Sequence, residues 1–215
     1  MSSVISTEIG PQSFEIVRDR IGRILAEELE NQYKLTLNPL LKVSNWIERF
    51  LPFDNTELPS VNVMLAEGTY DGQTAIQTDG TYRYYIDVFV NAKTKPGDAG
   101  DQKAMRGLHK IIGICRAIIQ DARYKTLGFP TPSGFIMNRH FESIQIKEPK
   151  QKDNDLMSTA MGRLILSVKV PEVTSYIQPV SGQFMATTVK LESTERGYRW
   201  VRENAYDPYD FAYDV

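Results

Sequence analysis

The sequence has few residues of the types on which metal and redox chemistry depend. Its 215 residues include one cysteine, Cys115, and two histidines, His109 and His140. A single cysteine cannot form a disulfide within the chain. Two histidines in separate segments supply too few ligands for a typical zinc site. We therefore expect no disulfide framework, no metal centre and no bound cofactor.

The chain also lacks a strong net charge and a long apolar run. Lys and Arg total 25 and Asp and Glu total 27, which gives a formal charge of −2. The basic excess that nucleic-acid binding usually needs is absent. The apolar stretches are interrupted by charges well before the roughly 18 residues of a membrane span, and no signal-peptide pattern opens the sequence. We expect a soluble protein made in the cytoplasm, with no membrane partner and no sequence-specific nucleic-acid partner.

No common catalytic motif is present. The sequence contains no P-loop, GxGxxG, CxxC, HExxH or GxSxG pattern, which leaves the usual nucleotide, redox, metalloprotease and serine-hydrolase sites without a counterpart. A small carboxylate-dependent hydrolase or nuclease that uses Asp87 or Glu142 stays open as an alternative. Because no catalytic partner of either carboxylate is marked in the sequence, we do not expect an enzyme.

Two segments have apolar residues at steps of three and four, the spacing of one helix face. Residues 13–33 are predicted to form a helix capped by Ser13, and residues 98–124 a second helix capped by Asp98 or Asp101. Cys115 falls in the second apolar stripe, so we interpret it as a small buried residue and not as a nucleophile. The two stripes are Phe14, Val17, Ile21, Ile24, Leu25 and Leu29, and Ala104, Leu108, Ile111, Cys115, Ile118 and Ala122.

Alternating patterns predict strands. They occur at 60–68, 77–93, 135–149 and 161–172, with a fifth strand within 182–193 and a short helix around Trp46. Two Asp-Gly pairs predict a projecting loop at 68–80. The order of helices and strands favours an α+β fold, an antiparallel sheet with two main helices packed on one face. We divide the chain into a flexible N-terminus (1–12), a single α+β domain (13–193) and an extended C-terminal arm (194–215).

The strand at 77–93 has two different faces. Tyr82, Tyr84, Ile86, Val88 and Val90 alternate with a mixed set, Arg83, Tyr85, Asp87, Phe89 and Asn91. The first set is expected to face the core. Asp87 is expected to pair with Arg83 on the same face or with a residue of a neighbouring strand.

The arm at 194–215 is too aromatic for a solvated tail. Its six rings are interleaved with aspartates, and Tyr and Trp are typical of interface anchors. We consider two interpretations, an arm that folds back on its own domain and an arm that docks on a neighbouring subunit. The rings are Tyr198, Trp200, Tyr206, Tyr209, Phe211 and Tyr213.

Several segments together resemble a known family. They are an N-terminal amphipathic helix, a strand pair ending in "YRYYIDVFVNAK", a long helix with "LHKIIGICRAII" and a second strand pair ending in "RLILSVKV". In their order and pattern, residues 13–170 resemble the tail terminator (tail completion) proteins of long-tailed bacteriophages. The resemblance implies a structural virion protein of the tail or neck, assembled in the host cytoplasm. Such a protein forms a ring-shaped homo-oligomer, a hexamer, that caps the tail tube, ends its polymerisation and joins it to the head connector.

The resemblance also implies roles for particular residues. The partners would be other copies of the chain, tail tube subunits and connector or neck proteins, with DNA passing through the ring. Another neck, head-completion, tube or baseplate component is the alternative. The C-terminal arm and the segment 38–60 depart from the family pattern, and the segment 38–60 has no assigned role. The expected subunit interface comprises Arg83, Tyr85, Asp87, Phe89 and the six rings of the arm. The expected tube or connector contact comprises Tyr70, Asp71, Gln73 and Asp79.

Overall fold

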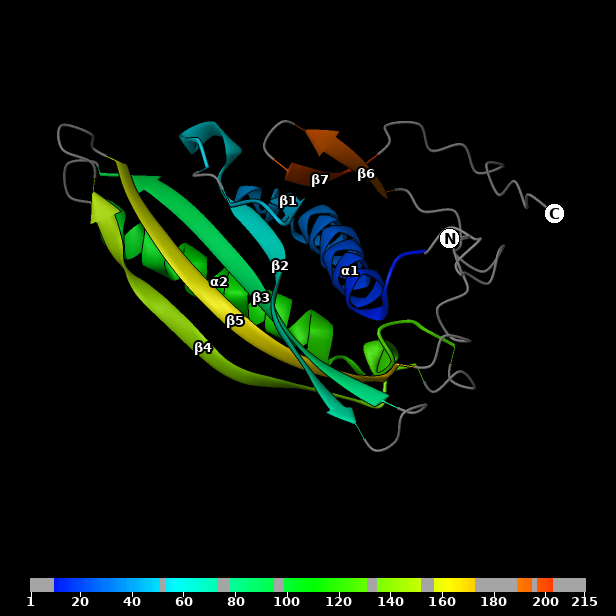
Figure 1. The fold of residues 1–215 in the computed structure, drawn as a ribbon. Helices are drawn as coiled ribbons and strands as arrows, with labels where there is room; N and C mark the ends of the chain where they lie inside the picture. The colour runs from blue at the N-terminus through cyan, green and yellow to red at the C-terminus, as the bar shows by residue number, and fades with distance from the viewer. Residues whose placement is uncertain are drawn as a thin grey trace, which may run out of the picture.

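The computed structural model places two long helices on one face of a seven-stranded sheet (Figure 1). The helices are α1 (Ser13–Thr36) and α2 (Gly100–Gln120). The structure describes residues 10–50, 53–72, 78–94, 99–130, 135–151, 157–172, 189–194 and 197–202. The strands are β1 (Ser44–Ile47), β2 (Ser60–Gly72), β3 (Thr78–Lys93), β4 (Asn138–Gln151), β5 (Met157–Pro171), β6 (Val189–Thr194) and β7 (Gly197–Arg202). Short 3-10 helices are η1 (Pro39–Leu41), η2 (Asn55–Glu57) and η3 (Ala122–Tyr124).

The order of strands across the sheet is β4-β5-β3-β2-β1-β7-β6. The predicted α+β class and the packing of both helices on one face are confirmed. The sheet is mixed and not purely antiparallel, because β1 runs parallel to β2, with Ser44 opposite Ser60. The predicted short helix around Trp46 is wrong, since Trp46 lies in β1 and is buried between its neighbouring strands. Four residues are too few to show a period, so the pairing with β2 decides their conformation.

The C-terminal strands extend the sheet beyond β1. The strand expected within 182–193 corresponds to β6, and β7 pairs antiparallel with both β6 and β1. Tyr198 and Trp200 lie in β7, opposite Ile47 and Asn45 of β1. The sequence interpretation began a separate arm at residue 194, whereas the structure places Gly197–Arg202 in the sheet as β7. The other four rings of the predicted arm lie outside the described residues.

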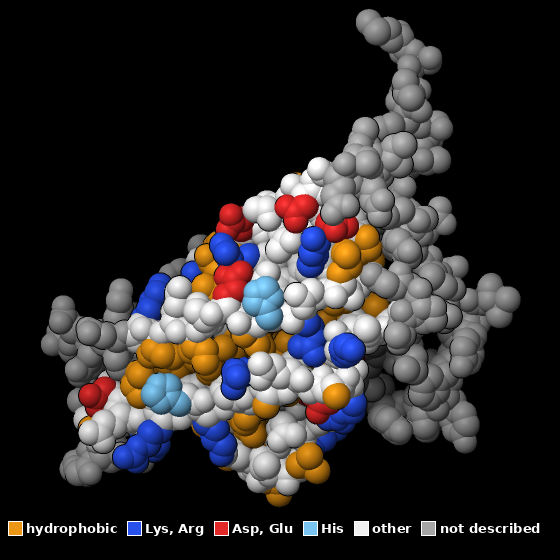
Figure 2. Space-filling model, turned by 90° about the horizontal axis from the view of Figure 1, so that it is seen from below, with side chains coloured by type: hydrophobic (Ala, Val, Ile, Leu, Met, Phe, Trp, Pro, Cys, Tyr) orange, Lys and Arg blue, Asp and Glu red, His pale blue; other side chains and the backbone are white. Residues whose placement is uncertain are grey.

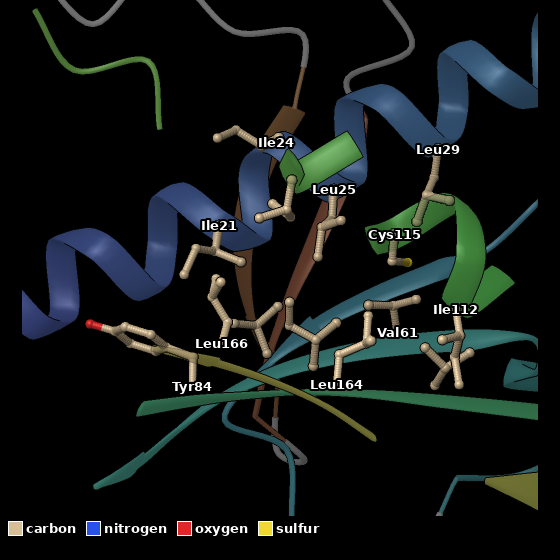
Figure 3. Packing of buried hydrophobic residues seen from close by; sticks show 14 of the residues in the cluster. Ile21, Ile24, Leu25, Leu29, Val61, Tyr84, Ile112, Cys115, Leu164 and Leu166 are labelled. Atoms are coloured by element: carbon tan, nitrogen blue, oxygen red, sulfur yellow. The ribbon is translucent and has the colours of Figure 1, made fainter. Parts of the chain in front are cut away.

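One apolar core lies between the helices and the sheet (Figure 3). α1 packs mainly on β1 and β2, and α2 packs on β3 and β5. In Figure 3, Ile21 and Leu25 of α1 and Ile112 of α2 point toward Tyr84 and Leu164 of the sheet. The predicted core face of β3 is confirmed, because all five of its members are at most 2% exposed. Those members are Tyr82, Tyr84, Ile86, Val88 and Val90.

Two buried phenols fix the start of α1 on β3. The Tyr84 hydroxyl donates to the Phe14 carbonyl oxygen at 2.9 Å, and the Tyr82 hydroxyl donates to the Glu172 carboxylate. Burial raises the pKa of both phenols, which therefore stay neutral donors. The helix cap differs from the prediction. Gln12, not Ser13, is the cap residue, and it forms a capping box with Glu15.

Cys115 is fully buried in the core, as its position in the stripe predicts. Burial raises the pKa of its thiol to about 12, so almost no reactive thiolate exists near neutral pH. We expect the native protein to remain unlabelled by a thiol reagent such as dithionitrobenzoate, while the protein in concentrated guanidinium chloride reacts at once. Cys115→Ser should give no signal in either solvent. Rapid stoichiometric labelling of the native protein would contradict this burial.

Candidate interaction surface

The face of the sheet opposite the helices carries a row of large and polar side chains. In register across four strands lie Trp46 of β1, Asn62 of β2, Asp87 of β3 and Arg163 of β5. Their strand neighbours point to the core, so alternation places these four on the helix-free face. The mixed character predicted for the second face of β3 therefore continues across the sheet.

Asp87 and Arg163 form a two-point ion pair at the centre of this row. Arg163 Nε donates to Asp87 Oδ1 at 2.6 Å and Nη2 donates to Oδ2 at 2.8 Å. The Asp87 side chain is only 3% exposed and that of Arg163 is 20% exposed. The guanidinium also lies over the Tyr85 ring, 3.8 Å from its centroid. The neighbouring-strand partner expected for Asp87 is thus Arg163, and Asp87 itself presents almost no surface to another molecule.

Arg83 lies on the same face but in a more open position. Its Nη1 is 2.5 Å from Glu67 Oε2, and its Nε is 2.8 Å from Glu142 Oε2. The hydrogen bond and the negative charge of Glu142 raise the pKa of Arg83. With a side chain that is 40% exposed, Arg83 links β2, β3 and β4 by charge and remains accessible at the surface.

The segment between β1 and β2 covers part of this face. Arg49 packs against two rings, with its guanidinium carbon 4.0 Å from the Trp46 centroid and 4.1 Å from the Phe53 centroid. It donates to both oxygens of Glu57, at 3.0 and 2.7 Å. The Phe53 ring in turn lies 4.8 Å from that of Phe89. The segment 38–60, which the sequence left without a role, therefore covers Phe89 from within the same chain.

The end of the β2–β3 hairpin extends beyond the helices (Figure 1). The predicted loop 68–80 is mostly paired strand, with register continuing to Gly72 opposite Thr78. Tyr70 is 59% exposed, and the Asp71 side chain is 64% exposed while that of Asp79 is 12% exposed. Lys169 Nζ lies 3.2 Å from Asp79 and 3.4 Å from Asp71. Gln73 lies outside the described residues.

The described residues offer no assembled metal site. No group of three or more His, Cys, Asp or Glu side chains among them is close enough to hold a metal ion. In the same part of the chain, neither helix is both long and apolar enough to cross a membrane. No protein-family model matches this chain, and no curated protein matches it. The geometry of the surface is therefore the basis for a functional interpretation.

The edge strand β4 carries exposed apolar side chains that the sequence interpretation did not single out. Ile144 and Ile146 are 49% and 40% exposed, although they lie opposite the core-facing positions Leu164 and Gly162 of β5. The sequence predicts a strand here but does not show which of its side chains are buried. The missing information was that β4 lies at one end of the strand order, so its outer flank has no strand beside it among the described residues.

Proposed function

We propose that this chain is a structural protein of a phage virion, which forms a ring at the end of the tail tube, ends tube polymerisation and joins the tail to the head connector. The observation that carries the proposal is the presence of two separate exposed features, the projecting β2–β3 hairpin and the apolar β4 edge. The order of helices and hairpins, which resembles that of tail terminators, supports it.

A ring is built from one repeated contact between two different patches on each subunit. The strand order gives the sheet two unlike ends, β4 with its exposed isoleucines and the β7–β6 pair that leads into the C-terminal residues. A contact that joins one end to the opposite end of a neighbour is heterologous. Such a contact generates a closed ring when the rotation per subunit closes.

The projecting hairpin supplies the surface for contact with the tube or connector. Tyr70 packs edge-on against Tyr82, with 5.9 Å between ring centroids, so its orientation is fixed while most of its ring stays exposed. An oriented aromatic ring on one face of the hairpin, with the charged Asp71 on the opposite face, is a suitable anchor for a protein partner. In this proposal the hairpin gives specificity and the ends of the sheet give assembly.

Electron microscopy of the purified protein tests the ring directly. We expect class averages with six-fold symmetry and a central lumen, and tubes of limited length when the protein is added to polymerising tail tube subunits. Tyr70→Ala should reduce tube capping about tenfold while leaving rings intact, because one exposed anchor is lost. Leu37→Ala, at an exposed apolar residue at the end of α1, is the matched control and should cap normally.

The symmetry of the particle separates the proposal from its alternatives. Twelve-fold rings would identify a connector instead of a terminator. Rings that leave tube length unchanged would favour another neck or head-completion component. A protein that stays monomeric at high concentration, and also when tubes are present, would contradict ring formation.

A further inference from the structure

β4 is a long edge strand, and no other described strand pairs with the outer side of its middle part. It spans Asn138–Gln151, and its register with β5 is regular from Ser143 to Lys147 between two bulges. The backbone N–H and C=O groups on the outer side of an edge strand can pair with another strand. Soluble proteins usually protect such edges, and the bulges here protect only the ends of β4.

The two sides of this open stretch differ in character. On the helix side, Ile144 and Ile146 continue an apolar strip toward Ile112 of α2. That strip approaches α2 closely because Gly162 has no side chain, and a Cβ there would lie 2.3 Å from Ile112 Cδ1. On the other side lies Lys147. Figure 2, the view onto the β4 side, shows hydrophobic side chains in a band with Lys and Arg side chains nearby.

One exposed basic side chain of α2, Arg116, lies beside the strip. Arg116 is one helical turn from Ile112, so it lies on the same side of α2 as the strip. An added strand that suits this edge would have one apolar face and a negative charge.

The C-terminal residues of this chain have that pattern. Residues 203–215 contain Glu203, Asp207, Asp210 and Asp214 and no Lys or Arg. From residue 209 onward, apolar and other residues alternate at a period of two, as in a strand with one apolar face. The apolar set is Tyr209, Phe211, Tyr213 and Val215, and the intervening set is Asp210, Ala212 and Asp214.

We infer that residues 209–215 of one copy add as a strand to the β4 edge of a second copy, with their rings on Ile144 and Ile146 and their carboxylates on the opposite face, the side of Lys147. This deepens the proposed function, because it names the contact that would join neighbouring subunits of the ring. The contact uses main-chain hydrogen bonds for affinity and the two isoleucines for register.

Residues 209–215 are too close to β7 in the sequence to reach the β4 edge of their own chain. β7 ends at Arg202, and Figure 1 places β7 and β4 on opposite sides of the molecule. A strand added outside β4 would lie six strand positions from β7, or about 29 Å at the usual spacing. From Arg202 to Tyr209 there are seven residue steps, which span at most about 25 Å when fully extended. The segment therefore has to come from another copy, which makes the contact heterologous.

A complementation experiment with the full-length chain tests this assignment. Ile144→Glu disables the acceptor edge, and the paired change Phe211→Ser with Tyr213→Ser disables the donor. Native mass spectrometry should show each variant alone as a monomer and an equimolar mixture as a 1:1 dimer with nothing larger, since one functional donor and one functional acceptor remain. Met137→Glu, an equally exposed position just before β4, is the matched control and should assemble as the unaltered protein does.

A second measurement keeps the inference testable if the unaltered protein does not form rings. A fluorescein-labelled peptide of residues 203–215 is titrated onto the donor variant, whose β4 edge is free of its neighbours' segments. We expect binding that is about tenfold or more weaker when Ile144→Glu is added, with unchanged thermal melting of the protein. Peptide binding without rings would support this contact while the ring function fails.

Three results would overturn the inference. One is equal peptide binding with and without Ile144→Glu. Another is normal ring formation by both variants, which would leave the proposed function intact. The third is a dimer that persists in the donor variant, because two β4 edges would then be pairing directly.

Discussion

Replacing Arg163 with glutamine is expected to lower the free energy of unfolding by about 3 kcal/mol, because it leaves a buried carboxylate without its partner. The Asp87 side chain is 3% exposed, so water cannot replace the two hydrogen bonds that Arg163 donates. Asp87→Asn should cost less, since Arg163 keeps its position over the Tyr85 ring and its side chain is 20% exposed. The measurement is the midpoint of urea denaturation. The midpoints can be compared when the slope of the unfolding free energy against urea concentration is the same in each variant.

The double variant, Asp87→Asn with Arg163→Gln, distinguishes a lost pair from a general loss of packing. An amide pair can still form hydrogen bonds without a buried charge, so we expect the double variant to be more stable than Arg163→Gln alone. Arg83→Gln is the matched control on the same face, where the ion pairs are exposed, and it should leave the denaturation midpoint almost unchanged. Equal losses for Arg163→Gln and Arg83→Gln would contradict a buried pair at the centre of the sheet.

The same comparison separates a structural Asp87 from a catalytic one. If Asp87 acts only within the sheet, its substitution changes stability and leaves the exposed hairpin and the β4 edge as they are. A hydrolase that used Asp87 as its catalytic carboxylate would require Asp87 to contact a substrate. A side chain held by both oxygens and almost fully covered does not meet that requirement.

Much of the fold follows from local patterns in the sequence. The alternation of Tyr82, Tyr84 and Ile86 predicts which face of β3 is buried, and the stripe containing Leu108 and Cys115 does the same for α2. These patterns predict the buried faces correctly because the core-facing residues of each element recur at the period of its helix or strand. The helix cap was harder, because Ser13 is a good cap by type while Gln12 forms the capping box with Glu15.

Features that depend on distant pairing could not be found in this way. Asp87 meets Arg163 only because β3 and β5 pair in one register, and no local signal fixes a register between strands so far apart in sequence. The parallel pairing of β1 with β2 likewise depends on contacts between strands, which leave no local signal in the sequence. The exposure of Ile144 likewise depends on the place of β4 in the strand order, which alternation does not reveal.

Arg49 is the residue through which the segment between β1 and β2 is fixed on the sheet, and its replacement is the second large effect that we expect. Its side chain is fully buried, packed against the rings of Trp46 and Phe53 and bonded to both oxygens of Glu57. Arg49→Ala should lower the free energy of unfolding by about 3 kcal/mol. Arg49→Lys should recover only part of the loss, because an ammonium group can neither stack as a plane nor bond both oxygens in a fork.

Acid should weaken the same attachment in the unaltered protein. The hydrogen bonds from Arg49 lower the pKa of Glu57. The stabilising contribution of Glu57 is therefore complete above the ordinary glutamate pKa of about 4.3 and is lost as pH falls through the lower folded value.

Proteolysis tests the attachment of the segment at neutral pH. Because Arg49→Ala removes the contacts that hold the segment, chymotrypsin should cleave within 50–58 faster in this variant than in the unaltered protein. Arg123→Lys, at an exposed arginine that bonds both oxygens of Asp121, is the control and should change neither cleavage nor the denaturation midpoint. Equal cleavage of all three proteins would mean that other contacts hold the segment on the sheet. Faster cleavage in Arg49→Ala alone would show that the aromatic cover over Phe89 depends on this one guanidinium.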